Sequence, residues 1–371
     1  METPLLNRSI VSLFFLFFII FQPSFSAEQC NPKDKRVLLR MKRALKNPSV
    51  LDSWDPSTDC CNEWNSVTCN HETHRVNSLT ISGGLQGQIP RQIGDLSFLE
   101  TLVLLKHRNL EGSIPPTISR LKRLSYLTIS STNISGPIPN FLGQMRRLRS
   151  IDLSYNTLSG PIPSSLALIP NLTSLHLNRN KLTGPIPASF GQFSGSDFDL
   201  HLSHNQLSGR IPASLGNKLD FNDVNLSRNR LEGDASFLFG RRKRIRALDL
   251  SRNMLQFELS KVRFPRTLTW LDLNHNRING TLPAGLTKLN FQMLNVSYNR
   301  LCGSIPLGGE LQRLGFKNFV VIMVIGSVKL DCENGENGMD SDLGKMIGPM
   351  FGPMVRLWPD GSIGSGPMGR L

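Results

Sequence analysis

The chain has 371 residues, of which 39% are hydrophobic and 7% aromatic. This length can bury a large core, but the scarcity of large side chains favours several small stacked cores over one globule. The formal net charge of +14 would indicate a nucleic-acid partner in a cytosolic protein. In an exported protein it indicates extracellular polyanions, such as acidic wall polysaccharide, or serves solubility alone.

The segment 1–26 has the pattern of a secretory signal peptide. Arg8 precedes an apolar run, Ile10–Phe21, and Ser24 and Ser26 occupy the small-residue positions before a cleavage site. The apolar run is shorter than the roughly 20 residues that a bilayer-spanning helix needs. We therefore predict export to the extracellular space or plant cell wall, with no membrane span and no nucleic-acid partner.

Residues 27–75 contain four closely spaced cysteines, Cys30, Cys60, Cys61 and Cys69, which predict a disulfide-stapled N-terminal cap. Four cysteines allow three pairings, and a bond between the neighbours Cys60 and Cys61 would strain the backbone. Of the other two pairings, we favour Cys30 with Cys60 and Cys61 with Cys69. Zinc binding would require paired C-x-x-C spacing, which this segment lacks, so no metal is expected.

The same segment contains one predicted helix, residues 34–45. Its apolar residues Val37, Leu38, Met41 and Leu45 recur at helical spacing and form one face. Such a face can cover the apolar end of a stack of repeats, which would otherwise be exposed to water.

Residues 76–314 contain a sequence pattern whose asparagines recur with spacings of 23 to 25 residues. The fourth repeat shows the pattern in full, as L-x-x-L-x-L-x-x-N-x-L-x-G-x-I-P from Leu148 to Pro163. There are ten repeats, the last ending at Pro306, when an opening unit with Gly84 in place of the asparagine is included. We expect each recurring asparagine to be a buried structural residue that bonds backbone groups of adjacent coils. The asparagines assigned to this row are Asn109, Asn133, Asn156, Asn180, Asn205, Asn229, Asn253, Asn276 and Asn299.

The spacing of these asparagines predicts a leucine-rich-repeat solenoid, a right-handed curved coil of about ten plant-type repeats. In L-x-L, the two leucines point inward and the residue between them points outward, so stacked strands form a parallel β-sheet on the concave face. The G-x-I-P stretch permits a turn followed by a 3-10 path on the convex face.

The outward residues of the concave sheet fall into two predicted columns. The central column, inside each L-x-L, is Val103, Thr128, Asp152, His176, His201, Asn225, Asp249, Asp272 and Asn295. The flanking column, before each asparagine, is Arg108, Thr132, Tyr155, Arg179, His204, Arg228, Arg252, His275 and Tyr298. Neighbouring strands lie about 4.8 Å apart, so each column is a continuous row of side chains.

These columns predict a protein-binding surface with a basic stripe beside a column that contains several acids. Any solvent-facing column must be polar, but that requirement alone does not cluster charges of one sign. Histidines in both columns would strengthen binding in an acidic wall, and His201 and His204 lack a third metal ligand. The predicted binding residues are Asp152, Tyr155, His176, Arg179, His201, His204, Asn225, Arg228, Asp249, Arg252, Asp272 and His275.

Asp249 and Asp272 lie in adjacent repeats, and two carboxylates about 5 Å apart are what a retaining glycosidase uses. A flat sheet, however, offers no pocket that would raise the pKa of one carboxylate or exclude water. The sequence also lacks a nucleophile elbow and a phosphate loop. We therefore expect a binding protein with no enzymatic activity and no cofactor.

The run Arg241–Arg244 lies between repeats, where it could bind de-esterified pectin or form a plain solvated loop.

Acceptor sequences for N-glycosylation begin at Asn133, Asn171, Asn225, Asn279 and Asn295. Because the first belongs to the asparagine row, and the third and fifth to concave strands, we expect glycans at Asn171 and Asn279.

Several segments together resemble the plant polygalacturonase-inhibiting proteins over about residues 30–314. They are DCCNEW at 59–64, the G-x-I-P repeats, LEGDAS at 231–236, where the I-P rule is broken, and LCGSIP at 301–306. The resemblance implies a secreted defence glycoprotein that binds fungal or other pathogen polygalacturonases. The net charge separately favours acidic pectin as a second partner. The alternatives are an extracellular recognition or signalling protein that binds peptides or receptors, and a wall- or ice-binding protein.

Residues 315–371 depart from that family, because a Gly- and Met-rich tail, predicted to be poorly ordered, replaces a cysteine-bearing closing cap. Cys302 loses the partner that it has in the family, and Cys332 is one candidate to replace it. The tail's apolar stretch, Phe319–Val328, is too short to span a bilayer. Association with the wall is therefore expected to be peripheral.

Overall fold

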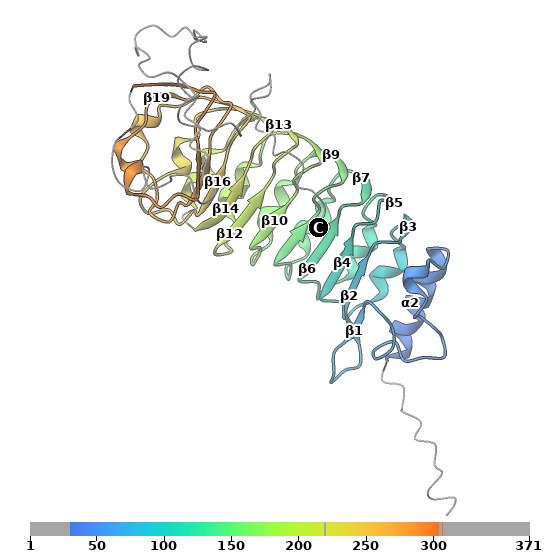
Figure 1. Ribbon diagram of the computed structural model, residues 1–371. Coiled ribbons are helices and arrows are strands. Elements are labelled where there is room, and N and C mark those ends of the chain that lie inside the picture. Colours follow the sequence, from blue (N-terminus) through green and yellow to red (C-terminus); the bar gives the residue numbers. More distant parts are fainter. Residues whose placement is uncertain (1–29, 219, 304–305, 307–371) are drawn as a thin grey trace, which may run out of the picture.

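The structure, a computed structural model, describes residues 30–218, 220–303 and 306, so the predicted signal peptide and tail lie outside the described residues. Figure 1 shows a row of coils stacked side by side, with a helical cap at the N-terminal end. Within the described residues, no helix is both long and apolar enough to cross a membrane. The cap contains α2 (Pro32–Ala44), the 3-10 helix η1 (Ser49–Leu51) and β1 (Val67–Cys69).

One sheet of eleven strands extends along the whole stack. β1 pairs antiparallel with β2, and the later strands follow in parallel, one from each repeat. This arrangement confirms the predicted leucine-rich-repeat solenoid with ten repeats. The ten strands are β2 (Val76–Ser82), β4 (Thr101–Leu105), β6 (Tyr126–Ser130), β8 (Ser150–Asp152), β10 (Ser174–His176), β12 (Phe198–His201), β14 (Phe221–Asn225), β16 (Ala247–Asp249), β18 (Trp270–Asp272) and β20 (Met293–Asn295).

On the opposite, convex side, each of the first nine coils contains a short 3-10 helix, as predicted. Most of these helices follow a proline in extended conformation. Proline suits this position because its ring fixes φ and it has no backbone N–H that would need an acceptor. The helices are η2 (Arg91–Asp95), η3 (Pro116–Arg120), η4 (Asn140–Gln144), η5 (Ser164–Leu168), η6 (Ala188–Gln192), η7 (Ala213–Asn217), η8 (Ser236–Leu238), η9 (Leu259–Lys261) and η10 (Ala284–Lys288).

A second sheet of eight parallel strands forms where the chain leaves the concave face, and sequence reasoning did not predict it. Each strand has only two to five residues. The strands are β3 (Gln86–Gln88), β5 (Asn109–Gly112), β7 (Asn133–Gly136), β9 (Thr157–Pro161), β11 (Lys181–Gly184), β13 (Gln206–Arg210), β15 (Arg230–Gly233) and β17 (Met254–Leu255). β19 (Asn279–Thr281) and β21 (Arg300–Cys302) form a separate pair.

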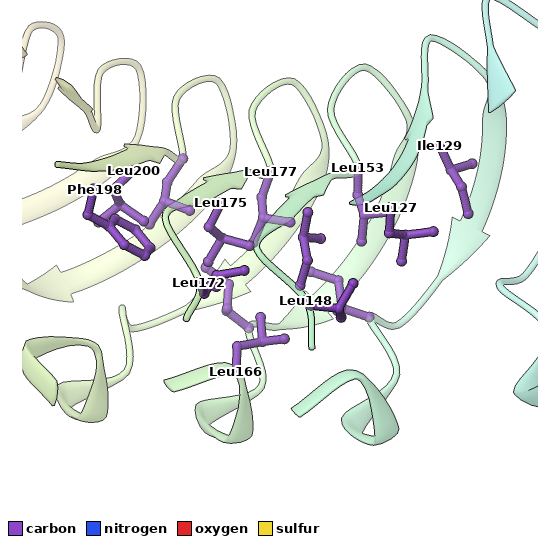
Figure 2. Packing of buried hydrophobic residues seen from close by; sticks show 14 of the residues in the cluster. Leu127, Ile129, Leu148, Leu153, Leu166, Leu172, Leu175, Leu177, Phe198 and Leu200 are labelled. Carbon is purple, nitrogen blue, oxygen red and sulfur yellow. The ribbon is translucent and has the colours of Figure 1, made fainter. Parts of the chain in front are cut away.

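The leucines of the repeat form one continuous core between the main sheet and the 3-10 helices (Figure 2). In the fifth repeat, Leu172, Leu175, Leu177 and Leu182 are completely buried. Full burial of a leucine side chain contributes about 1.5–3 kcal/mol. Because each coil buries these side chains against its neighbours, the stability of one coil depends on the next.

The asparagine row joins neighbouring coils by hydrogen bonds. The amide nitrogen of Asn180 donates to the carbonyl of Leu177 in its own coil (3.0 Å) and to that of Leu153 in the preceding coil (2.9 Å). Donation to both coils recurs at Asn156, Asn205, Asn229, Asn253, Asn276 and Asn299. These seven asparagines have the structural role expected of them.

The assignment was wrong for the second and third repeats. Asn109 and Asn133 are exposed, at the starts of β5 and β7, and His107 and Thr132 are buried in their place. The reason is register, since the row position lies three residues after the second leucine of L-x-L, where Asn156 stands. Asn109 and Asn133 come one or two residues too late.

His107 and Thr132 perform the same function with different chemistry. The imidazole of His107 accepts from the backbone amide of Leu85 at 3.2 Å, and its Nε2 lies 3.0 Å from the carbonyl oxygen of Ile81. The hydroxyl of Thr132 donates to Oδ1 of Asn156 at 2.5 Å. Both residues therefore link adjacent coils as an asparagine would.

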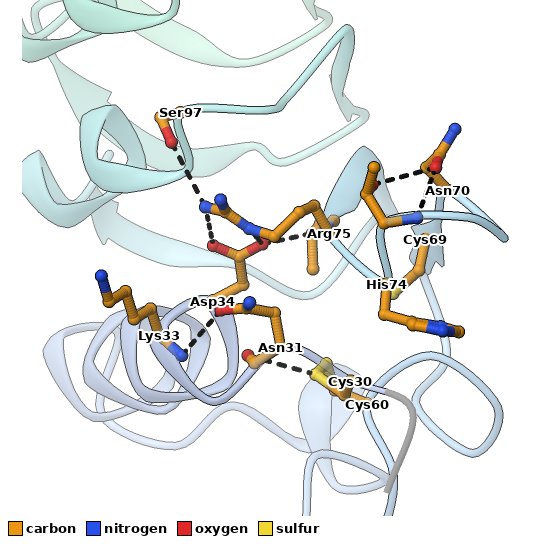
Figure 3. Close-up of polar contacts among 12 residues, drawn as sticks. Cys30, Asn31, Lys33, Asp34, Cys60, Cys69, Asn70, His74, Arg75 and Ser97 are labelled. Carbon is orange, nitrogen blue, oxygen red and sulfur yellow. Dashed lines mark hydrogen bonds and ion pairs between the residues drawn. A yellow bond between two sulfur atoms is a disulfide. The ribbon is translucent and has the colours of Figure 1, made fainter.

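Asp34 attaches α2 to the first coil (Figure 3). Its buried carboxylate accepts from Nε and from a terminal guanidinium nitrogen of Arg75, each at 2.8 Å, and from the backbone amide of Val76 at 3.0 Å. α2 begins at Pro32, and the side chain of Asn31 caps it. The helix thus covers the apolar end of the stack, as expected.

Two disulfides, Cys30–Cys60 and Cys61–Cys69, staple the cap, and the Cα atoms of each pair are 5.4 Å apart. They have the pairing that was favoured from the sequence. The cap is therefore disulfide-stapled and contains a helix, as predicted. Cys332 lies outside the described residues, so its pairing with Cys302 stays a prediction.

Candidate binding face

The central column lies in register across the main sheet. Asp152 is the direct strand partner of His176, His176 of His201, and His201 of Asn225. The register continues through Asp249 and Asp272. Because the flanking leucines are buried, these residues face the solvent side of the sheet, which we call the concave face.

The acids and asparagines of the central column also stabilise the bend that ends each strand. Oδ1 of Asp249 accepts from the backbone amide of Ser251 at 3.0 Å and from its hydroxyl at 2.6 Å. The same bond to the amide two residues later is made by Asp152, Asn225, Asp272 and Asn295. These side chains are therefore held in place before any partner binds.

The flanking column has a left-handed backbone conformation in every repeat from the fourth onward. Its φ values lie between 52° and 56° at Tyr155, Arg179, His204, Arg228, Arg252, His275 and Tyr298. A non-glycine residue in this region costs of order 1 kcal/mol, and hydrogen bonds between coils compensate, such as that from the Arg179 amide to the Ser203 carbonyl (2.8 Å). In the second and third repeats, Lys106 and Ser131 have this conformation, so the assignment of Arg108 and Thr132 to the column was wrong.

Five side chains of the flanking column form a continuous basic stripe, namely Arg179, His204, Arg228, Arg252 and His275. Burial lowers the pKa of His204, and the charges of Arg179 and Arg228 lower it further. Burial, Arg252 and Arg228 likewise lower the pKa of His275. Each histidine therefore interacts with two arginines, and the stripe acts as one positively charged surface.

His176 and His201 stack ring on ring in the central column, with centroids 4.3 Å apart and planes 8° apart. Burial, and then His201, lower the pKa of His176. Nε2 of His201 lies 3.4 Å from a carboxylate oxygen of Asp223, which becomes an ion pair only when the ring is protonated. Within the described chain, this nitrogen and Nδ1 of His204 are buried without a hydrogen-bond partner.

Asp272 has a raised pKa, contrary to expectation. Burial raises the pKa and Asp249 adds to the effect, while hydrogen bonds from Asn274 and Asn295 oppose it, which leaves the pKa at about 6. The expectation that this face would perturb neither carboxylate was therefore wrong. Both carboxylates nevertheless accept backbone hydrogen bonds that tie them to the fold.

Sequence reasoning missed a third column, which lies two residues before the central column and faces the same side because strands alternate with period two. It includes Asp199, Asp223 and Trp270, and the indole of Trp270 is 43% exposed. Residues of this column and their neighbours line a depression of about 370 Å³. The lining residues are Asn222, Asp223, Asn225, Arg246, Ala247, Asp249, Thr269, Trp270 and Gln292.

One group among the described residues brings potential metal ligands together, namely Cys30, Asp59, Cys60 and Cys61. All three sulfur atoms take part in the two disulfides. A disulfide sulfur has no thiolate to offer a metal ion, so this cluster is a structural part of the cap.

The potential glycosylation sites differ in accessibility. Asn171 and Asn279 are exposed, while the side-chain oxygens of Asn225 and Asn295 are used in strand-end hydrogen bonds. Asn133, which was set aside as a buried row residue, is exposed as well. Three sites are therefore sterically open, and occupancy at Asn171 and Asn279 stays a prediction.

The basic run at 241–244 is less uniform than its sequence suggests. Arg241, Arg242 and Arg244 are exposed, but Lys243 is buried. Its ammonium group donates to the carbonyl of Lys218 at 2.9 Å and to that of Gly216. Lys243 therefore satisfies the backbone of the preceding coil and is not available to a polyanion.

Profiles of leucine-rich-repeat families match four segments of this chain. The leucine rich repeat N-terminal domain matches residues 31–70, which include α2 and the disulfide Cys61–Cys69. Leucine rich repeat profiles match residues 122–182, 199–218 and 267–289.

Two curated relatives are similar over most of their length. A polygalacturonase inhibitor of Vitis vinifera is 59% identical over 298 residues, 80% of this chain and 89% of the relative. A polygalacturonase inhibitor of Pyrus communis is 58% identical over 305 residues, 82% of this chain and 92% of the relative. The chain belongs to the plant polygalacturonase inhibitor family. This is a family of inhibitors and not a known class of enzymes.

The same architecture occurs in a protein with a different described activity. The crystal structure of a plant ice-binding protein is 51% identical, with a TM-score of 0.75, and the match covers 77% of this chain and 92% of that one. High similarity within this fold is therefore compatible with more than one kind of ligand.

Proposed function

We propose that the chain is a secreted plant-defence protein that binds pathogen endopolygalacturonases through the concave face and inhibits them. The observation that supports this most is family membership, with 59% identity to a polygalacturonase inhibitor over 89% of its length. Secretion rests on the signal-peptide pattern of residues 1–26 and on the two disulfides of the cap, which form in oxidising compartments.

Binding relies on a preorganised surface that needs no chemistry of its own. The basic stripe runs beside a central column that contains Asp152, Asp249 and Asp272, so the concave face presents parallel rows of opposite charge. Complementary charge rows steer association and select one orientation of the partner. Because strand-end hydrogen bonds already hold the acids of the central column, these side chains lose little conformational entropy on binding.

Three histidines of the face make binding sensitive to pH. The pKa values of His176, His204 and His275 are lowered, so these rings are neutral at pH 7 and become protonated only in more acidic solution. Acidification from neutral pH thus adds positive charge to the face. It strengthens binding to an acidic enzyme surface, as expected for a protein of the cell wall.

The direct test mixes the purified protein with a panel of fungal endopolygalacturonases and measures the release of reducing ends from polygalacturonate. We expect saturable inhibition of at least one enzyme, with no turnover by the protein alone. If no enzyme in a broad panel is inhibited, the chain is instead a recognition or signalling protein of the same fold.

The identity of 51% to a plant ice-binding protein favours ice binding as a second candidate function. An ice-recrystallisation assay tests it on the same preparation. Inhibition of crystal growth at micromolar concentration would support it, and growth indistinguishable from that in an inert protein control would exclude it.

A further inference from the structure

One hollow of the concave face has no role in the proposed inhibition. It is the depression of about 370 Å³ that lies over β14, β16 and β18, in the seventh to tenth repeats. Its volume falls within the range of roughly 300–1,000 Å³ that is typical of small-molecule sites. We call it the Trp270 depression after the aromatic residue in its wall.

A small side chain opens the Trp270 depression. Ala247 pairs with Asp223 of β14 on one side and with Trp270 of β18 on the other. All three residues belong to the third column, so Asp223 and Trp270 stand two strand spacings, about 10 Å, apart across the methyl group of Ala247. Ala247 is therefore the floor, and a larger side chain at this position would fill the space.

The wall formed by Trp270 is an open aromatic surface. Its indole is 43% exposed, and among the described residues no aromatic ring or cationic group stacks on it. Covering an exposed aromatic face with a flat apolar surface removes both from water and is favourable. The C–H face of a pyranose ring is such a surface.

The other walls offer hydrogen-bonding groups of both kinds. Oδ1 of Asp249 and Oδ1 of Asn225 are used at the strand ends, so Oδ2 of Asp249 and Nδ2 of Asn225 keep no hydrogen bond in the described part of the chain. Arg246 and Gln292 are exposed at the rim. Donors and acceptors around one aromatic wall suit a ring that carries several hydroxyl groups.

We propose that the Trp270 depression binds one neutral pyranose ring, at the end of a glycan or of an uncharged polysaccharide. The ring stacks on Trp270 above Ala247. Its hydroxyl groups donate to the carboxylates of Asp223 and Asp249 and accept from Arg246. Such binding is independent of the proposed inhibition, since it uses no residue of the basic stripe.

The charges of the lining favour an uncharged ligand. A uronate ring would bring its carboxylate beside Asp223 and Asp249, and like charges disfavour each other at this distance. A lysine side chain would suit these two acids, but Arg246 lines the same depression and Nε2 of His201 already lies 3.4 Å from Asp223. A neutral ring with hydroxyl groups can bond to both signs of charge without such a conflict.

The test measures binding by saturation-transfer NMR on the full chain. Production in a bacterial periplasm allows the disulfides to form and leaves Asn225, which begins an acceptor sequence, without a glycan. Two probes distinguish the sources of the ring, namely the trimannosyl core of an N-glycan and cellotetraose, an uncharged polysaccharide fragment. We expect at least one of them to bind with a Kd of about 1 mM, as for one well-placed ring. The probe that binds identifies the source.

Ala247→Leu, which fills the floor, and Trp270→Ala, which removes the wall, test the site itself. Each should weaken binding of that probe at least about tenfold. The matched control is Tyr126→Ala, because Tyr126 holds the same position in the third repeat and is 47% exposed, but its strand partners are Thr101 and Ser150, which carry no charge. The control should change the affinity by less than about twofold, and circular dichroism checks that all three variants fold.

Three results would overturn the proposal. The first is that neither neutral probe binds to the wild type. The second is an equal loss in Tyr126→Ala and Trp270→Ala, which would place the bound ring elsewhere. The third is tighter binding of a charged probe, either tetragalacturonate or N-acetyl-lysine amide, which would make the depression a site for a uronate or for a cationic side chain.

Discussion

At the scale of single residues, the concave face combines structural and binding roles in neighbouring positions. Asp152, Asn225 and Asp272 each accept a hydrogen bond from the amide two residues later. That bond fixes the backbone directly before the left-handed residue of the flanking column. The side chain of that residue therefore projects from a fixed position. The flanking side chain can therefore vary in identity without disturbing the fold, which suits a surface that evolves toward different partners.

Asp272 provides a test of the electrostatics of this face. Its folded pKa of about 6 lies above the ordinary value of 3.8, so its carboxylate destabilises the folded state once ionised. Stability is fully present below about pH 4 and is lost as the pH rises through 6. Asn225 and Asn295 make the same hydrogen bond as neutral side chains, so Asp272→Asn should keep it and remove the penalty.

We expect Asp272→Asn to raise the free energy of unfolding by about 1–2 kcal/mol at pH 7.5 and to leave it nearly unchanged at pH 4. Urea denaturation at the two pH values measures the difference. An equal effect at both pH values would mean that packing, and not ionisation, is what the substitution changes.

The central column could be assigned from the sequence alone, because the spacing of leucines sets its register. Asn109 and Asn133 were misassigned because they were chosen as asparagines and not by their distance from the leucines. The row position itself is occupied by His107 and Thr132. Counting from the leucines would have found both. The raised pKa of Asp272 could not be foreseen, since it depends on burial by side chains of the adjacent strands.

At the scale of elements, the asparagine row connects each coil to the one before it. The amide of Asn156 donates to the carbonyls of Ile129 and Leu153, at 2.7 and 3.0 Å. Asn156→Ala leaves these buried groups unsatisfied, and we expect it to lower the free energy of unfolding by about 2–4 kcal/mol. Asn109→Ala, at an exposed asparagine, is the matched control and should change it by less than about 0.5 kcal/mol. Similar losses at both positions would refute the corrected register.

The junction between α2 and the first coil depends on one buried ion pair. Asp34 is 1% exposed and accepts three hydrogen bonds from Arg75 and Val76. Asp34→Ala leaves the Arg75 charge without its partner, so we expect a loss of about 3–5 kcal/mol in chemical denaturation. Asp95→Ala, which breaks only the exposed pair with Arg120, should cost less than about 1 kcal/mol. A small loss in both variants would show that apolar packing and the disulfides hold the cap without this ion pair.

Among the elements, α2 and the ten main strands were predictable from the spacing of their apolar residues, and the 3-10 helices from the G-x-I-P stretch. The second sheet was not, because its strands have two to five residues and no alternation of their own. They form only because stacking places equivalent extended segments side by side. Their hydrogen bonds are a consequence of the coil and not a local preference.

At the scale of the whole molecule, repetition turns scattered charges into surfaces. Arginines that lie one repeat apart in the sequence become neighbours, so the basic stripe arises from residues of several coils. Sequence register predicted the stripe, since its residues share one position in the repeat. The column with Trp270 was not predicted, because it lies two residues before the central column, outside the positions inside and after L-x-L that define the two predicted columns.

The most direct test of the concave face as the inhibitory surface is the inhibition constant of charge-reversed variants against a polygalacturonase that the wild type inhibits. Arg228→Glu/Arg252→Glu changes the basic stripe, while Arg91→Glu/Lys288→Glu makes the same change of charge on exposed convex 3-10 helices. We expect the first variant to raise the inhibition constant by about 100-fold or more and the second by less than about threefold. Equal effects, or a larger effect of the convex pair, would contradict a concave binding face.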